Sequence, residues 1–149
     1  MKFKTTIKNK SRLINKLKKL SKAAQTPVKK AVLTNGLFLQ GDIKRMIANG
    51  GRSGVSYERG GISSIRSAPG EPPKTDSGNL VGSIQFRLTD SGFSGEVYTN
   101  SVYARALEFG FAPNNLAARP FMQPGFERNK DKVVKKIGHV TKIALRSKL

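Results

Sequence analysis

Apolar residues in the first 48 positions recur every three or four residues, which is the spacing of one face of an α-helix. The first such stripe consists of Leu13, Leu17, Leu20 and Ala24, and the second of Val28, Val32, Leu39, Ile43 and Ile47. Thr26-Pro27 stands between them, and Thr is a good N-cap while Pro is a good first helical residue. The pattern therefore predicts helices over 12–25 and 27–48. Gly36 falls on the second stripe, where a missing side chain would let another backbone approach.

Gly, Ser and Pro dominate residues 49–79, which predicts a long loop in which Tyr57 and Ile62 indicate a short strand or hairpin. Alternating apolar residues then predict strands over 83–88 and 93–99, joined by a turn at 90–92. A helical turn over 103–109 ends at Gly110, and a last helix opens at Pro120 or Pro124. The predicted fold class is α+β, with a small antiparallel sheet packed by the long N-terminal helix and the C-terminal helix.

A chain of 149 residues has the usual length of one domain, so we expect a single domain over 1–149, with a basic and flexible segment at 1–10. There is no cysteine, which excludes disulfides and thiolate metal sites. No apolar run approaches the roughly 20 residues of a membrane span, and no apolar segment follows the basic N-terminus, so neither a membrane helix nor a signal peptide is expected.

The formal net charge of +19 lies at the two ends of the chain. Residues 1–41 hold eleven Lys or Arg and no acid, residues 128–149 carry +7, and the centre carries only +1. One interpretation is a solvated lysine surface. The other is contact with a polyanion, either DNA or an acidic protein, through delocalised attraction. The candidate contact residues are Lys16, Lys18, Lys19, Lys132, Lys135 and Lys136. Lysine suits such attraction better than bidentate reading of bases.

The sequence does not indicate catalysis. His139 is the only histidine and is expected on the surface, so neither a histidine triad nor a multi-histidine metal site can form within one chain. The segment 50–54 is Gly-rich but lacks the Gly-Lys-Ser/Thr ending of a phosphate-binding loop. We therefore expect no catalytic residue, cofactor or metal.

The centre contains motifs with structural and interface interpretations. Asp76 is expected to cap a turn before Gly78, and Glu108 to accept hydrogen bonds from Arg105, Arg119 or backbone donors; subunit contacts are the alternative for both acids. The aromatic residues Phe109, Phe111 and Phe121 either pack in the core or anchor an adjacent subunit.

An ordered set of short motifs carries a family resemblance. The set comprises Ser67 to Pro73, Thr75 to Gly78, Leu80, Ser83-Ile84, Tyr103, Leu107 to Gly110, and Ala118 to Phe121 with Pro124. In this order it resembles the small tail-completion proteins of long-tailed bacteriophages, also called head–tail joining or neck proteins.

The resemblance implies a non-enzymatic virion protein that is assembled in the host cytoplasm and located at the head–tail junction. It implies a hexameric ring of this chain, with the capsid connector or adaptor protein and the tail tube or terminator protein as partners. DNA would pass through the ring and touch it transiently and non-specifically. The residues proposed for subunit contacts are Glu71, Asp76, Tyr103, Glu108, Phe109, Arg119 and Phe121.

Two further expectations follow. The loop 49–79 would be mobile in the monomer and become ordered on assembly, so that a chain without residues 52–66 would fold but form no ring. The alternative function is a basic nucleic-acid-binding protein that acts through its Lys-rich terminal helices.

Overall fold

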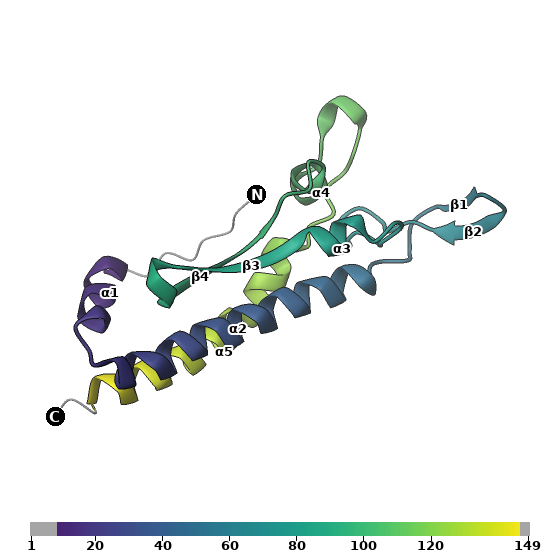
Figure 1. Ribbon diagram of the computed structural model, residues 1–149. Coiled ribbons are helices and arrows are strands. Elements are labelled where there is room, and N and C mark those ends of the chain that lie inside the picture. Colours follow the sequence, from purple (N-terminus) through teal and green to yellow (C-terminus); the bar gives the residue numbers. More distant parts are fainter. Residues whose placement is uncertain (1–8, 147–149) are drawn as a thin grey trace.

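The computed structural model describes residues 9–146, which form an α+β fold, as predicted (Figure 1). The helices are α1 (Lys10–Lys18), α2 (Lys22–Ala48), α3 (Asn79–Ser83), α4 (Ala104–Phe109) and α5 (Met122–Arg146), with short 3-10 turns η1 (Asp90–Gly92) and η2 (Ala112–Asn114). The strands are β1 (Ser56–Arg59), β2 (Ile62–Ile65), β3 (Ile84–Thr89) and β4 (Ser94–Thr99). They form two separate antiparallel hairpins, β1–β2 and β3–β4, where one small sheet was expected.

Helix α2 is the central element of the fold, because it packs against both α5 and the β3–β4 hairpin (Figure 1). The predicted stripe of α2 is buried throughout, and Ile43 and Ile47 are almost completely excluded from solvent. Asp42, on a more polar side of α2, accepts hydrogen bonds from Arg128 and Asn129 of α5, each at 2.6 Å. These charge-assisted contacts fix α5 along α2.

The boundary between the first two helices differs from the prediction. The break falls at residues 19–21, and Ser21 is the N-cap of α2. The side-chain amide of Gln25 donates to the backbone carbonyl of Leu20 at 2.8 Å, which satisfies an acceptor at the end of the first helix. Pro27 lies inside α2, near its start, where its missing N–H removes one intrahelical hydrogen bond. Local side-chain capping therefore decides this boundary.

The β3–β4 hairpin confirms the two predicted strands within one residue of their bounds. Ile84 pairs with Thr99, and Phe86 pairs with Val97. The ring of Phe86 lies against Gly36 of α2, and a Cβ atom on Gly36 would overlap it. The element that approaches Gly36 is therefore an aromatic side chain, where a backbone was expected.

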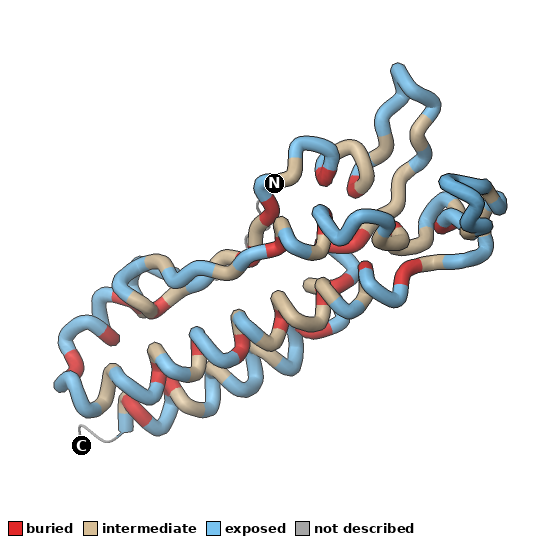
Figure 2. Tube along the Cα trace, turned by 45° about the vertical axis from the view of Figure 1, so that its right-hand side comes forward, coloured by how far each residue is buried: buried red, intermediate tan, exposed pale blue. Residues whose placement is uncertain are grey.

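The β1–β2 hairpin occupies the centre of the predicted loop 49–79, which confirms the hairpin suggested by Tyr57 and Ile62. Its turn is Gly60-Gly61, and both residues have positive φ, as a two-residue hairpin turn with the twist of its strands requires. Neither strand contains a buried residue (Figure 2). Most of the segment 1–10, expected to be flexible, lies outside the described residues.

The apolar core consists of two clusters along α2. The larger joins α2, the β3–β4 hairpin and the start of α5, and includes the fully buried Ile84 and Phe121. The smaller lies at the other end of α2 and is made by Ile14, Leu17, Leu20, Val28, Phe93 and Ala144. Helix α1 therefore packs on the molecule through a separate cluster.

Candidate functional site: a junction of three sequence motifs

Three motif segments that are distant in sequence meet in the structure. We call residues 67–73, 107–110 and 118–121 together the motif junction. The amide of Gly70 donates to the carbonyl of Ala118 at 2.8 Å, and the amide of Arg119 donates to the carbonyl of Leu107 at 2.6 Å. The guanidinium of Arg119 also donates to the carbonyl of Ser67 at 3.1 Å. Arg119 thus ties all three segments together.

Glu108 is the buried acid of the junction, with 3% of its surface exposed. Its carboxylate accepts hydrogen bonds from the amides of Phe121, Met122 and Gln123 at 2.8, 3.0 and 2.9 Å. These amides begin α5, where backbone donors lack intrahelical partners and negative charge is favourable. Of the donors expected for Glu108, which were Arg105, Arg119 or backbone amides, the structure shows backbone amides. The Glu108 side chain therefore holds the start of α5 against α4.

Glu71 fastens the base of the β1–β2 hairpin to the junction. Its carboxylate accepts from the hydroxyl of Ser53 at 2.5 Å and from the amide of Ala68 at 2.8 Å. The Ser53 hydroxyl, followed by the Ala68 amide, lowers the pKa of Glu71 below its ordinary value. The amide of Gly51 donates to the carbonyl of Pro72 at 3.0 Å. The hairpin therefore leaves the body from an anchored base.

Asp76 forms an exposed ion pair with Arg59 of β1 at 2.5 Å. The prediction that Asp76 caps the turn before Gly78 is wrong, because the hydroxyl of Thr75 accepts from the Gly78 amide at 3.1 Å. The ion pair instead links the hairpin to the segment that precedes α3.

The aromatic residues divide between core and surface. Phe121 is fully buried, whereas Phe109 is 58% and Phe111 45% exposed. Val102, which is 95% exposed, and Tyr103, which is 43% exposed, lie on the same segment 101–117, and we call its exposed apolar side chains the apolar apex. This segment projects from the layer formed by β3 and β4 (Figure 1).

A hollow of about 460 Å³ separates the β1–β2 hairpin from α4. Tyr57, Asp76, Tyr103 and Arg119 are among its lining residues. Lys74 also lines it, and its ammonium group donates to the hydroxyl of Ser64 at 2.9 Å. Asp76, Lys74 and Arg119 make contacts within the chain, with Arg59, Ser64 and Ser67 respectively.

The lysines proposed for polyanion contact lie on two elements. Lys16 and Lys18 belong to α1, and Lys19 follows it. Lys132, Lys135 and Lys136 lie on the exposed side of α5. Lys132 and Lys136 stand over the ring of Phe38, at 4.5 and 6.0 Å from its centre.

His139 is exposed, as predicted. Within residues 9–146, no three His, Asp or Glu side chains are grouped so that they could hold a metal ion. No helix of the described chain is long and apolar enough to cross a membrane.

The fold and the junction define a small α+β protein in which the sequence motifs hold one another in place. Residues 11–110, about two thirds of the chain, match the family described as "Bacteriophage HK97-gp10, putative tail-component". The chain belongs to this HK97-gp10-like family and is a tail-related structural protein of a bacteriophage virion. The family match confirms the predicted relationship to phage tail and neck proteins.

One similar curated protein comes from Methanocaldococcus jannaschii and is described as uncharacterized. It is 41% identical over 54 residues, which are 34% of this chain and 40% of that protein. The chain thus spans about two fifths of the length of this relative. No solved structure matches the chain.

Proposed function

We propose that the protein forms a closed ring at the head–tail junction of the virion and joins the capsid connector to the tail tube without catalysing a reaction. The observation that carries this proposal is the apolar apex, an exposed apolar surface on a segment that Glu108 and Arg119 hold firmly. Exposed apolar patches on soluble proteins commonly mark interaction sites. Membership of a tail-component family supports a partner of the same assembly.

In a ring, each subunit uses two different surfaces, because the contact runs head to tail. The second surface is the β1–β2 hairpin, where Val55, Ile62 and Ile65 are 78%, 71% and 41% exposed. The apex of one subunit would pack on the hairpin of the next. Both surfaces lie in the central part of the chain, whose net charge is only +1, so this contact avoids the repulsion of the basic ends.

The test is the mass in solution, measured by light scattering for the chain alone and co-expressed with the tail tube protein of its phage. Six copies of 16.3 kDa give about 98 kDa for a hexamer. Phe109→Ser and Ile62→Ser should each abolish the ring, whereas Leu37→Ser, at a 49% exposed position of α2, should leave it intact. Rings that survive both interface changes, or a wild-type chain that stays monomeric with its tail proteins, would overturn the proposal.

The alternative function is binding of a polyanion, and one observation favours it. Lys132, Lys135 and Lys136 are exposed on α5, and none of them pairs with a carboxylate of the described residues. Such a surface attracts DNA by releasing condensed counterions.

Titration of a fluorescent DNA duplex at several salt concentrations tests this alternative. A DNA-binding function requires substantial affinity at about 0.15 M salt and a steep salt dependence. Replacing the three lysines of α5 by glutamine should then weaken binding while the ring persists. Equal binding by the substituted chain would exclude these lysines as the contact.

A further inference from the structure

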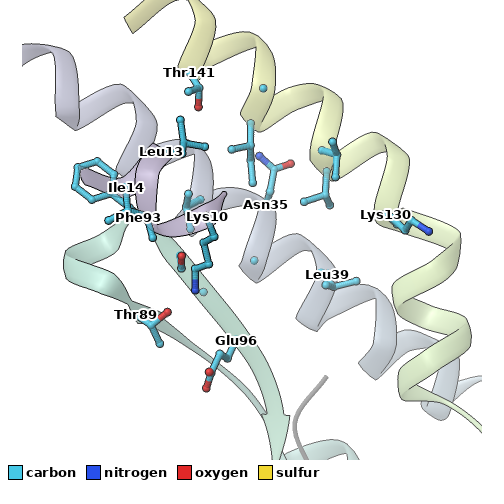
Figure 3. Close-up of a pocket in the computed structure, with 18 of the residues that line it drawn as sticks. Lys10, Leu13, Ile14, Asn35, Leu39, Thr89, Phe93, Glu96, Lys130 and Thr141 are labelled. Carbon is cyan, nitrogen blue, oxygen red and sulfur yellow. The ribbon is translucent and has the colours of Figure 1, made fainter. Parts of the chain in front are cut away.

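A second hollow lies away from the motif junction, between α5 and the β3–β4 hairpin. It has a volume of about 670 Å³, α2 forms its floor, and residues of α1 line it as well. Leu13, Leu39 and Thr141 are among the side chains that point into it from three different helices (Figure 3). We call this hollow the α5 groove. Its lining is mainly apolar and includes Val97 of β4 and Ile137 of α5.

The dimensions of the groove indicate the kind of occupant it can take. Its lining residues on α5 run from Met122 to Arg146, and twenty-four steps of 1.5 Å make it roughly 36 Å long. A helix that lies along the groove and inserts one apolar face fits this shape.

Gly138 supplies a second observation. It lies inside the 25-residue helix α5 and lines the groove. A glycine in a helix interior costs about 1 kcal/mol relative to alanine. A Cβ atom on Gly138 would meet nothing within 4 Å, so the packing of this chain does not require a glycine there. The glycine leaves this part of α5 without a side chain over the groove.

The charges around the groove indicate the chemistry of that partner. Lys10, Lys130, Lys142 and Arg146 line it, against the single acid Glu96. Glu96 is held by Arg87 at 2.9 Å. Among the described residues, Lys142 and Arg146 have no carboxylate within salt-bridge distance. The rim is therefore positively charged and complementary to acidic side chains.

We propose that the α5 groove binds an acidic amphipathic helix of another protein. A second copy of this chain is a poor occupant, because its amphipathic helices α1 and α5 carry Lys and Arg on their polar sides and would be repelled by the rim. Apolar side chains of the partner would enter the groove, and its carboxylates would meet Lys142 and Arg146. The proposal stands whether or not the chain forms a ring, since the groove is separate from the apolar apex.

The probe is a synthetic fluorescent peptide of about 24 residues, matched to the groove length, with leucine at every third or fourth position and glutamate at most others. Its binding to the full chain is measured by fluorescence anisotropy. A second peptide replaces each glutamate by lysine, and a third has a proline at its centre. The first peptide should bind at least about tenfold more tightly than each of the other two.

Matched substitutions separate the groove from general attraction to a basic protein. Gly138→Leu fills the groove, whereas Gly41→Leu fills similar open space on α2 outside it. Lys142→Glu changes the rim, whereas Lys135→Glu changes an exposed lysine that does not line the groove. The first member of each pair should weaken binding by about tenfold or more, and the second by less than about threefold.

Unfolding cannot account for the expected loss in Gly138→Leu, because replacing a helical glycine by leucine should raise the melting temperature. Equal loss in both members of each pair would show diffuse charge attraction and overturn the proposal. Equal binding of the acidic and the proline-containing peptide would overturn the helical occupant, and no binding by any peptide would overturn the site.

Discussion

Replacing Glu108 by alanine would leave the amides of Phe121, Met122 and Gln123 without their shared acceptor. A hydrogen bond to a charged group contributes about 1.5–3 kcal/mol, so the three together give a gross loss of roughly 4–9 kcal/mol. Removing a carboxylate that is only 3% exposed also relieves its desolvation, which offsets part of this loss. We therefore expect the free energy of unfolding to fall by about 3 kcal/mol, above the 0.5–2 kcal/mol usual for an exposed N-cap.

Urea denaturation followed by circular dichroism measures this change. With a slope of about 2 kcal/mol per molar urea, a loss of about 3 kcal/mol lowers the midpoint by about 1.5 M at unchanged slope. Hydrogen exchange should become faster first at amides 121–123. Glu127→Ala is the matched control, because Glu127 is an exposed glutamate of α5 that forms a surface ion pair with Lys130 at 3.2 Å. This change should alter stability by less than about 0.5 kcal/mol. A loss below about 1 kcal/mol for Glu108→Ala, or unchanged exchange at 121–123, would refute the capping argument.

Three further outcomes are expected. Phe121→Ala should lose about 3–5 kcal/mol of stability in urea denaturation, because the ring of Phe121 is fully buried. Phe109 is exposed, so Phe109→Ala should change the stability by less than about 0.5 kcal/mol. Similar losses for the two substitutions would contradict the assigned burial. Burial alone would raise the pKa of Asp42, but hydrogen bonds led by that from Arg128 lower it below the ordinary 3.8. The stability from this contact is therefore present above about pH 4 and is lost as the pH falls toward the lowered pKa. The melting temperatures of the wild type and of Asp42→Asn should converge on acidification. They would not converge if the carboxylate of Asp42 were unpaired. Replacing residues 55–66 by Gly-Gly should preserve the circular dichroism of the long helices and abolish ring formation in light scattering; intact rings would exclude the hairpin as an interface.

The sequence predicted most accurately the elements whose own residues show a periodic apolar pattern. The periodic stripe of α2 identified its buried face, and alternation identified β3 and β4. The boundary at residues 19–21 was missed because Thr26-Pro27 is a strong local start signal, yet Ser21 and Gln25 make the actual capping contacts. Propensity could not decide between two start sites only five residues apart.

The sequence identified the motifs of the candidate site but not the way in which they contact one another in space. Glu108 was expected to accept hydrogen bonds and Arg119 was one of its candidate donors, but the actual partners of both lie on segments that only the folded chain brings together. The α5 groove had no periodic signal, because its lining comes from five elements. The sequence feature that marks the groove is Gly138, a glycine within a strongly amphipathic helix.

The division of the core into two clusters has a consequence for the order in which the molecule opens. Helix α1 is held by the smaller cluster, through Ile14, Leu17 and Leu20, and takes no part in the larger one. Segments held by few buried contacts open below the free energy of global unfolding, as separate cooperative units. The amides of α1 should therefore exchange in a lower-energy opening than those at the centre of α2. Since Lys10, Leu13, Ile14 and Leu17 line the α5 groove, each such opening removes one wall of it while the central fold stays intact.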